Sequence, residues 1–199
     1  MNSRQVWAVI VARTGPSAKS RLALALSPTE RSALARRMLR AVLEASLGAD
    51  LGGTLVVTET NEGAALATEL GALALPDPAA GLNAAVSLGL DVVAQQAPGT
   101  GALILPGDVP FVQSTDLAAM IEAAGDHPRV VVLVPDAARR GTNALLVRPP
   151  RVIEPSFGEP SFERHLRAAR RNATAIQLDL PNLAVDIDDE ARLALLAPT

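Results

Sequence analysis

The sequence predicts an α/β fold in a single domain, residues 1–199, with a doubly wound, mixed and mostly parallel sheet. Strand-like and helix-like segments alternate along most of the chain, and consecutive parallel strands need such helical crossovers. The first strand-like segment is an unbroken apolar run, which is typical of a strand buried on both faces. Hydrophobic residues make up 49% of the chain, which is enough to fill a core of this size. These observations together predict helices on both faces of the sheet.

The run QVWAVIVA, residues 5–12, predicts the first strand. A loop that contains glycine and serine separates it from the first long helix. That helix has a complete start signal: Ser27 is the N-cap, Pro28 takes the first helical position, and Glu30 closes a capping box. Gly48 is the predicted stop. The first strand and the first helix therefore form one unit of the fold.

The middle of the chain continues the alternation in shorter units. Residues 52–59 predict a second strand, and residues 61–71 predict a second helix. A short third strand at 72–75 ends at the turn sequence Pro-Asp-Pro. Residues 81–96 then predict a third helix, and residues 101–108 a fourth strand.

The C-terminal part mixes strands and helices less regularly. A helix at 114–125 follows Ser114, which is its predicted cap. The remaining segments are strands at 129–135 and 143–149, a helix at 161–172 opened by Ser161, strand-like stretches at 174–180 and 183–188, and a final helix at 189–197. We expect these late strands to add antiparallel edges to the sheet.

The composition excludes several classes of site and partner. The chain has no cysteine, which excludes disulfides, zinc–thiolate sites and thiol nucleophiles. A net charge of −3 and the lack of an aromatic platform argue against nucleic acid as a partner. No apolar run reaches the length of a bilayer span or of a secretion signal, so we expect a cytoplasmic protein with no membrane partner. His127 and His165 are isolated and receive no metal role, and the oligomeric state does not follow from the sequence.

Charged side chains follow several of the predicted strands, at the edge where open α/β sheets bind ligands. Lys19, the only lysine of the chain, lies after the first strand with Arg13 and Arg21. Asp108 ends the fourth strand, and Asp186 lies inside an apolar strand pattern, where a buried carboxylate needs a partner. Arginine and lysine neutralise phosphate oxygens, and carboxylates hold magnesium. This edge therefore predicts a site for a phosphate ligand with a divalent metal.

Each of these groups also has a purely structural interpretation. Lys19 and Arg21 could lie on a solvated loop, and Asp108 in PGDVP could form a turn. The acidic stretch DIDDE could be a helix N-terminus that places acids against the helix dipole, above all at Asp189 and Glu190.

Six stretches, in order along nearly the whole chain, resemble one family. They are AKSRLALALSPTERSALARRML, GLNAAV, LPGDVP, GTNALL, SFGEPSFERHLRAA and DID. The chain resembles the 2-phospho-L-lactate guanylyltransferases, which include the phosphoenolpyruvate and 3-phosphoglycerate guanylyltransferases and make an early intermediate of the deazaflavin coenzyme F(420). The resemblance implies a nucleotide-diphospho-sugar transferase-like fold. It also implies a reaction with Mg²⁺ that moves GMP from GTP to a small phospho-carboxylate and releases pyrophosphate.

The resemblance also implies roles for individual residues. Lys19, Asp108 and Asp186 would be catalytic, and the two aspartates would hold Mg²⁺ in one shared cleft. The implied nucleotide-binding residues are Arg13, Lys19, Arg21 and Asn83. The implied acceptor-binding residues are Thr142, Gly158 and Ser161, joined by Arg139 and Arg140. The two arginines replace small residues of the family's usual GTGTN sequence, and we expect one of them to meet the acceptor carboxylate while Glu159 points outward.

Two other functions stay open. Nucleotidyltransferases of this fold that act on molybdopterin or sugar phosphates typically carry a glycine-rich GGxGxR loop after the first strand, whereas this loop has only Gly15. A catalytically silent nucleotide-binding protein is favoured by the departures RRGTN and DIDDE, whereas the presence of Asp108 and Asp186 argues for catalysis. The identity of the acceptor and the strictness for guanine do not follow from the sequence.

Overall fold

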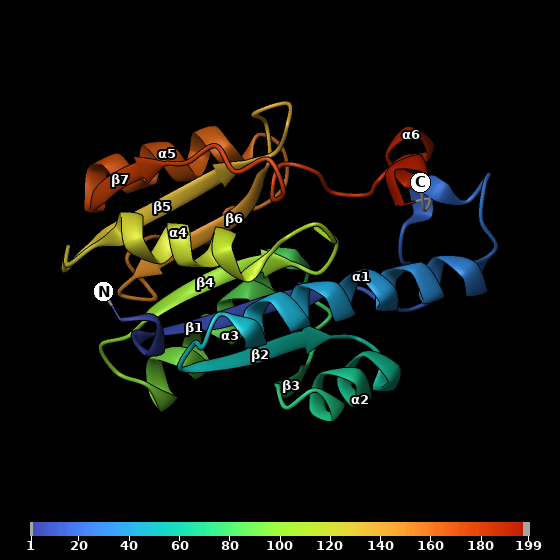
Figure 1. The fold of residues 1–199 in the computed structure, drawn as a ribbon, viewed down its shortest axis with the longest axis horizontal. Helices are drawn as coiled ribbons and strands as arrows, with labels where there is room; N and C mark the ends of the chain where they lie inside the picture. The colour runs from blue at the N-terminus through green and yellow to red at the C-terminus, as the bar shows by residue number, and fades with distance from the viewer. Residues whose placement is uncertain (1, 197–199) are drawn as a thin grey trace.

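The computed structural model describes residues 2–196, which form a seven-stranded sheet with helices on both faces (Figure 1). The strands are β1 (Val6–Ala12), β2 (Gly53–Thr58), β3 (Leu73–Pro76), β4 (Gly101–Pro106), β5 (Val130–Pro135), β6 (Thr142–Arg148) and β7 (Thr174–Gln177). The helices are α1 (Pro28–Gly48), α2 (Asn61–Glu69), α3 (Leu82–Gln96), α4 (Ser114–Ala124), α5 (Ser161–Asn172) and α6 (Glu190–Leu193), with 3-10 turns at Ser3–Gln5, Ser20–Leu22 and Ala194–Leu196. The predicted α/β class with a mostly parallel sheet is confirmed.

The strands lie in the order β3-β2-β1-β4-β6-β5-β7. β6 runs antiparallel to β4 and to β5, whereas the other neighbouring pairs are parallel. The expectation of antiparallel edges is therefore wrong, because the antiparallel strand lies inside the sheet. The short loop between β5 and β6 leaves no room for a crossover, so β6 returns alongside β5 in the opposite direction.

The core has two layers because the central strands are buried on both faces. In β1, Val6 and Ile10 pack into the cluster that contains α1, α2 and α4, whereas Val9 and Val11 pack into the cluster that contains α3 and α5. A Cβ at Gly89 of α3 would lie 2.4 Å from Cγ1 of Val9, so this helix approaches the sheet closely. The unbroken apolar run of the sequence thus reflects burial from both sides.

The start of α1 matches its sequence signal, and the start of α4 does not. Ser27 Oγ accepts from Glu30 N, and Glu30 Oε2 accepts from Ser27 N at 2.8 Å, which completes the capping box. At α4 the residue before the helix is Gln113, whose N–H donates to Asp116 Oδ2 at 2.9 Å. Ser114 is the first helical residue, and its hydroxyl donates to the carbonyl of Ala45 on α1. Its predicted role as a cap is wrong, because the hydroxyl joins two helices instead.

The last expected strand, 183–188, is a loop in the structure. Residues 181–184 form a turn, and the segment then bonds to other loops: Ala137 N donates to Ala184 O, and Ile187 N donates to Asp108 O. Leu183 and Ile187 are buried, so the apolar alternation marks anchors of a loop and not a strand ladder. The final helix is shorter than expected, since α6 gives way to a 3-10 turn at Ala194–Leu196, and Ala197 lies outside the described residues.

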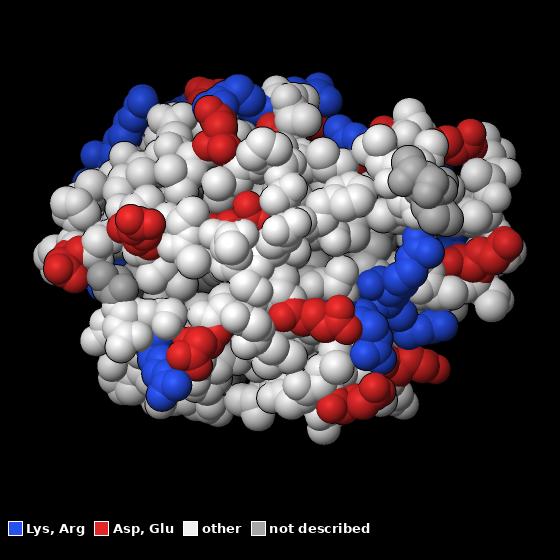
Figure 2. Space-filling model, viewed as in Figure 1, with Lys and Arg blue, Asp and Glu red and all other residues white. Residues whose placement is uncertain are grey.

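Figure 1 shows α6 beside the loop that follows β1, near the N-terminal end of α1. Leu22, Leu34, Met38 and Ile187 form a small separate cluster there, against which Leu193 of α6 packs. On the face drawn in Figure 2, acidic and basic side chains are interspersed. Within residues 2–196, none of the helices has the length and apolar character that crossing a membrane requires. The expected cytoplasmic location and the absence of a nucleic-acid partner stay predictions.

Candidate functional site

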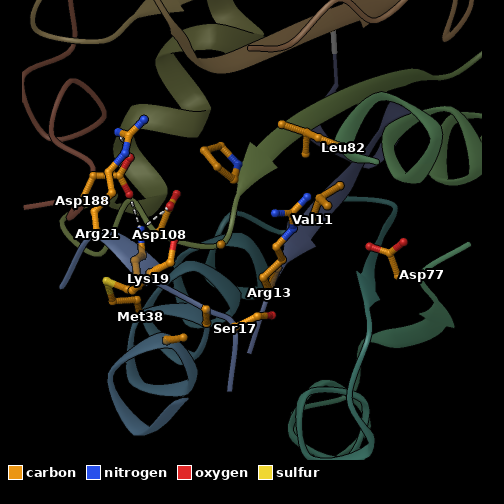
Figure 3. Close-up of a pocket in the computed structure, with 16 residues that line it drawn as sticks. Val11, Arg13, Ser17, Lys19, Arg21, Met38, Asp77, Leu82, Asp108 and Asp188 are labelled. Carbon is orange, nitrogen blue, oxygen red and sulfur yellow. Dashed lines mark hydrogen bonds and ion pairs between the residues drawn. The ribbon is translucent and has the colours of Figure 1, made fainter. Parts of the chain in front are cut away.

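The strand order brings two loops together at one edge of the sheet. The chain proceeds from β1 through β2 to β3, and β4 then pairs on the other side of β1, which is the kind of switch point where open α/β sheets bind ligands. The loop after β4 is held against β1, because Gly107 N donates to Val11 O at 2.9 Å. A cavity of about 440 Å³ opens at this point (Figure 3). Its charged lining consists of Arg13, Lys19, Arg21, Asp77, Asp108 and Asp188.

The loop after β1 is held from both sides by charged side chains, the exposed Glu59 and the buried Arg31. Glu59, which follows β2, accepts through Oε1 from Thr14 N at 3.0 Å and from Gly15 N at 2.9 Å. Arg31 of α1 is only 8% exposed, and its guanidinium donates hydrogen bonds to backbone carbonyls of the loop. Its acceptors are the carbonyls of Ala18, Leu26 and Pro16, at 3.1, 2.9 and 3.0 Å. These bonds hold the loop in the shape that presents Lys19.

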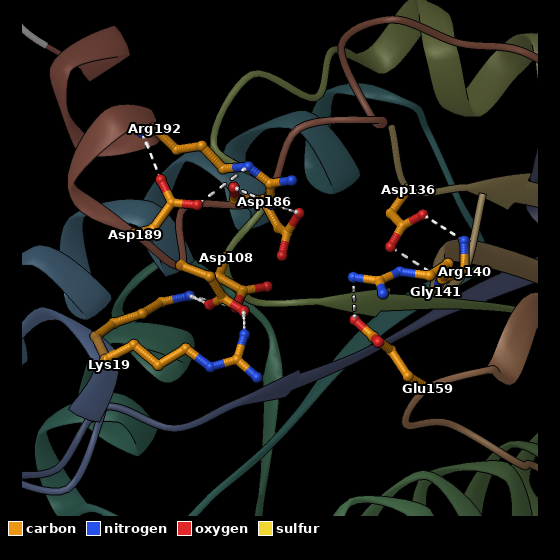
Figure 4. Close-up of polar contacts among 11 residues, drawn as sticks. Lys19, Asp108, Asp136, Arg140, Gly141, Glu159, Asp186, Asp189 and Arg192 are labelled. Atoms are coloured by element: carbon orange, nitrogen blue, oxygen red, sulfur yellow. Dashed lines mark hydrogen bonds and ion pairs between the residues drawn. The ribbon is translucent and has the colours of Figure 1, made fainter. Parts of the chain in front are cut away.

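Lys19 lies at the centre of the site, between two carboxylates (Figures 3 and 4). Its Nζ is 2.5 Å from Asp108 Oδ2 and 2.8 Å from Asp188 Oδ1, and its side chain is 8% exposed. The residue has φ 50°, a left-handed backbone that is uncommon outside glycine and costs energy to maintain. Burial alone would lower the pKa of Lys19, but the charges of Asp108 and Asp188 outweigh it, and the pKa rises above its ordinary value. The ammonium therefore stays charged at neutral pH.

Three aspartates lie near Lys19, and the pKa values of two of them are shifted in opposite directions. Burial, followed by the nearby charges of Asp188 and Asp108, raises the pKa of Asp186, although Arg192 Nη1 lies 2.6 Å from its Oδ1. Burial also acts to raise the pKa of Asp188, but the Lys19 ammonium and two arginines outweigh it and lower the pKa. Because Asp186 responds to both other carboxylates, the three groups lie within one electrostatic neighbourhood.

Figure 4 shows Asp108 and Asp186 near each other, but the lining of the cavity contains Asp108 and not Asp186, whose carboxylate pairs with Arg192. That the two carboxylates share one cleft stays a prediction. Among residues 2–196, no group of three or more His, Asp or Glu side chains is placed to hold a metal ion alone. Mg²⁺ commonly takes one or two carboxylates and completes its shell with water and substrate phosphates. The donor set of Asp108 and Asp186 fits that mode of binding, with a phosphate ligand as the missing partner.

The other predicted nucleotide-binding residues have different surroundings. Arg13 is exposed and lines the cavity on the side of Asp77, opposite Lys19 (Figure 3). Arg21 is largely exposed and pairs with Asp188 at 3.3 Å. Asn83, at the start of α3, clamps the backbone of Phe157: its Nδ2 donates to the carbonyl at 3.2 Å, and its Oδ1 accepts from the N–H at 2.6 Å. Its side chain thus binds the loop that precedes α5.

Thr142 and Ser161 come together where β6 meets the start of α5, and Gly158 lies in the loop three residues before Ser161. Thr142 and Ser161 are buried, and Ser161 Oγ donates to Thr142 Oγ1 at 3.3 Å. Gly158 has φ 93°, and a Cβ there would meet no atom within 4 Å, so its backbone conformation and not space requires glycine. The residue before the helix is Pro160, so Ser161 takes the first helical position and not the cap.

The two arginines before Thr142 face different neighbours. Arg139 Nη1 pairs with Asp179 at 2.6 Å, and its guanidinium lies 5.2 Å from the centre of the Phe162 ring. Arg140 Nη2 pairs with Glu159 at 3.4 Å, beside Gly158. In Figure 4 the Arg140 side chain extends toward the side of the site that carries Asp108 and Asp186. The Glu159 side chain is 54% exposed, and its carboxylate is turned toward Arg140 (Figure 4), so its expected direction away from the acceptor stays a prediction.

His165 of α5 is fully buried beside Thr142. Its Nε2 accepts from Ser156 N at 2.9 Å, and its Nδ1 lies 3.0 Å from Thr142 Oγ1. The rings of Phe157 and His165 pack in a T-shaped arrangement, with their centroids 4.8 Å apart. Burial, and to a smaller extent the adjacent Arg164 charge, lowers the pKa of His165 from 6.5 to about 4. The imidazole is therefore neutral at physiological pH.

This buried histidine predicts an acid-sensitive fold. Between pH 6.5 and 4 the imidazole of His165 is protonated in the unfolded chain but stays neutral in the folded chain. The free energy of unfolding therefore falls as the pH falls through that window. The loss is about 3 kcal/mol, at about 1.4 kcal/mol for each pH unit between the two pKa values. We expect the stability advantage of the wild type over His165→Asn, measured by urea unfolding, to shrink by about this amount from pH 7 to pH 4. Parallel pH curves for the two proteins would contradict it.

Several site residues were missed by reasoning from the sequence. Asp188 follows Asp186 by two residues but was given no role. The alternative interpretation of DIDDE as a helix start holds for Asp189, the cap of α6, and for Glu190 in its first turn. Arg31 and His165 lie within helix patterns and carry no local signal. Glu59 is the last residue of the second predicted strand, and this position at the ligand edge was the one signal that could have identified it.

Comparison with known proteins adds independent observations. A protein-family model described as "Guanylyl transferase CofC like" matches residues 6–197. A phosphoenolpyruvate guanylyltransferase from Rubrobacter xylanophilus is 42% identical over 193 residues, which cover 96% of this chain and 93% of the relative. A 3-phospho-D-glycerate guanylyltransferase from Phenylobacterium zucineum is 38% identical, with 91% of this chain and 84% of the relative covered.

Solved structures with the same fold are more distant in sequence. A nucleotidyl transferase from Methanothermobacter has a TM-score of 0.71 at 18% identity, with 96% of this chain and 95% of that chain covered. A protein from Desulfovibrio desulfuricans G20, proposed to be a nucleotide-diphospho-sugar transferase, has a TM-score of 0.76 at 13% identity, with 96% and 86% covered. At these identities the likeness concerns the fold alone.

Proposed function

This chain belongs to the family of CofC-like guanylyl transferases, as the six matching stretches predicted, and we propose that it moves GMP from GTP to the phosphate of a small phospho-carboxylate. The observation that carries the proposal is the buried Lys19 ammonium between Asp108 and Asp188, in the lining of a cavity of about 440 Å³. A charge-balanced cluster at this switch point suits the binding of a nucleoside triphosphate.

The proposed reaction needs little acid–base catalysis from the protein. An oxygen of the acceptor phosphate, which is already ionised, attacks the α-phosphorus of GTP, and the bond to the bridging oxygen breaks as pyrophosphate leaves. No proton has to be removed from the nucleophile, so a site with neither a reactive cysteine nor an exposed histidine base is sufficient. The work of the chain is to position two anions and to neutralise charge at the α-phosphate.

We propose a division of roles among the charged residues. Arg13, Arg21 and Lys19 face the phosphates of GTP in the cavity, where Lys19 also fixes the positions of Asp108 and Asp188. Asp108 and Asp186 would hold Mg²⁺, which neutralises developing charge on the reacting phosphate when it is bound. Arg192 holds Asp186 in place through the contact at 2.6 Å.

The acceptor would bind between β6 and α5. The Thr142 and Ser161 hydroxyls lie together there, next to the first turn of α5, whose N–H groups favour an anion. One of these N–H groups is already used, because Phe162 N donates to Arg140 O. We propose that Asn83 serves this loop through Phe157 and acts on the nucleotide only indirectly.

The experiment that tests the function offers GTP with phosphoenolpyruvate, 2-phospho-L-lactate and 3-phosphoglycerate in separate reactions containing Mg²⁺. We expect pyrophosphate release and a product whose mass equals the acceptor plus GMP with one of these acids. Such a product would serve in coenzyme F(420) biosynthesis, as the resemblance implies. Release of pyrophosphate only with a molybdopterin or sugar-phosphate acceptor would favour the other nucleotidyltransferase reading, and nucleotide binding without turnover would favour a silent protein.

The surroundings of the two arginines predict which one affects acceptor choice. Arg140 extends toward the carboxylates and pairs with the half-exposed Glu159, whereas Arg139 is engaged by Asp179 and Phe162. We expect Arg140→Thr to lower kcat/KM for the preferred acid by about tenfold to a hundredfold, the cost of a charge-assisted hydrogen bond, with little change in the KM for GTP. The matched variant Arg139→Gly should leave the ranking of acceptors in place. An unchanged ranking in Arg140→Thr would reduce Arg140 to a surface charge.

A further inference from the structure

The hydrogen-bond directions around His165 determine where its proton lies. The N–H of Ser156 can only donate, so Nε2 of His165, 2.9 Å away, must carry a lone pair. A neutral imidazole has one N–H, which is then on Nδ1. That group lies 3.0 Å from Thr142 Oγ1 and donates to it. A backbone amide thus selects the tautomer of the histidine.

Counting hydrogen-bond donors and acceptors in the same way determines the direction in which the Thr142 hydroxyl donates. A hydroxyl oxygen accepts two hydrogen bonds and donates one. Thr142 Oγ1 accepts from His165 Nδ1 and from Ser161 Oγ, so both acceptor positions are used. Its own hydrogen is then left to donate to a third group. The side chain is buried and β-branched, so the oxygen itself has little freedom to move.

We infer that His165 is a positioning residue that makes Thr142 a committed hydrogen-bond donor to the phosphate of the acceptor. A phosphate oxygen only accepts, so a Thr142 hydroxyl that could turn its lone pairs outward would oppose binding. The inference rests on the proposed function, because it requires an anionic acceptor at Thr142. His165 also fixes the loop of Ser156 and Phe157, which Asn83 and Arg164 hold from two other sides.

Two substitutions separate the two ring nitrogens. In His165→Asn the amide nitrogen can occupy the place of Nδ1 and still donate to Thr142, but the bond to Ser156 is lost. In His165→Gln the longer side chain can reach the place of Nε2 and accept from Ser156, but the donor to Thr142 is lost. We expect His165→Gln to raise the KM for the acceptor by about tenfold or more and His165→Asn by no more than about threefold, with the KM for GTP unchanged in both.

Thermal unfolding of the same variants distinguishes positioning from mere stability. If His165 had only a structural role, the variant with the lower Tm would also have the higher KM for the acceptor. The inference predicts the opposite order if His165→Asn is the less stable of the two. In addition, Thr142→Val removes the hydroxyl, and His165→Gln should have no further effect on the acceptor KM in that background.

The outcomes are distinct from those of the functional assay. A wild-type protein that forms no guanylylated product with any phospho-acid overturns the proposed function. A wild-type protein that is active, with equal acceptor KM values for His165→Asn and His165→Gln, overturns the role of His165 and leaves the function intact. Additive effects of Thr142→Val and His165→Gln would do the same.

Discussion

Replacing Lys19 with methionine is expected to lower kcat/KM for GTP by about a hundredfold to a thousandfold. Lys19 Nζ bonds to Asp108 at 2.5 Å and to Asp188 at 2.8 Å, and Asp186 lies in the same electrostatic neighbourhood. Without the ammonium, three carboxylates would face the incoming triphosphate with less opposing charge. Removing one preorganised donor from a partly buried site costs about this factor in turnover. Steady-state kinetics with GTP varied at a saturating acceptor concentration measure it.

Two further variants control for the loss of any positive charge. Arg21→Gln removes a largely exposed partner of the same Asp188, at 3.3 Å, and is expected to cost less than about tenfold. Arg40→Gln removes the surface pair of Arg40 with Glu69, outside the cavity lining, and should leave the kinetics unchanged. If Lys19→Met keeps the wild-type kcat/KM for GTP, Lys19 is a structural loop residue with no role in the reaction. A circular dichroism spectrum like that of the wild type ensures that a loss of activity is not a loss of fold.

The fold was predictable because burial on both faces of the central strands leaves a direct trace in the sequence. The run from Val6 to Ala12 is apolar at every position since both faces of β1 are covered. The alternation Leu183–Val185–Ile187 gave a similar signal for another reason: Leu183 and Ile187 anchor a loop that crosses the end of the sheet. A hydrophobic period of two residues reports which side chains are buried, and only backbone pairing makes such a segment a strand.

The site was predictable where charged residues lie in the loops that follow strands. Lys19 and Asp108 were found in this way, because the topology places the ends of β1 and β4 next to each other. Arg31 and His165 could not be found, since their partners are backbone groups and hydroxyls from other segments, and such pairings depend on tertiary structure. Asn83 illustrates the same limit: its position in the sequence suggested the nucleotide, while its two hydrogen bonds go to Phe157.

Asp108→Asn is the substitution with the largest expected effect, a loss of about a thousandfold in kcat with the fold retained. Asparagine has the same shape, but it removes a negative charge from the proposed metal site, where charge stabilisation is worth several kcal/mol. A neutral amide also weakens the contact with Lys19, whose ammonium keeps Asp188 as a partner. The rate, measured against Mg²⁺ concentration, should rise toward its maximum only at much higher Mg²⁺ than in the wild type.

Comparing Asp186→Asn with Asp188→Asn decides which carboxylate works with Asp108. If Asp186 is the second metal-binding group, Asp186→Asn raises the Mg²⁺ requirement, as Asp108→Asn does. Asp188 is bound to Lys19 and Arg21, so Asp188→Asn should instead raise the KM for GTP and leave the Mg²⁺ requirement close to that of the wild type. Asp91→Asn, which loses an exposed pair with Arg151, is the matched control for removing one acidic charge. The opposite pattern, with the Mg²⁺ requirement shifted by Asp188→Asn and not by Asp186→Asn, would move the metal site to Asp108 and Asp188.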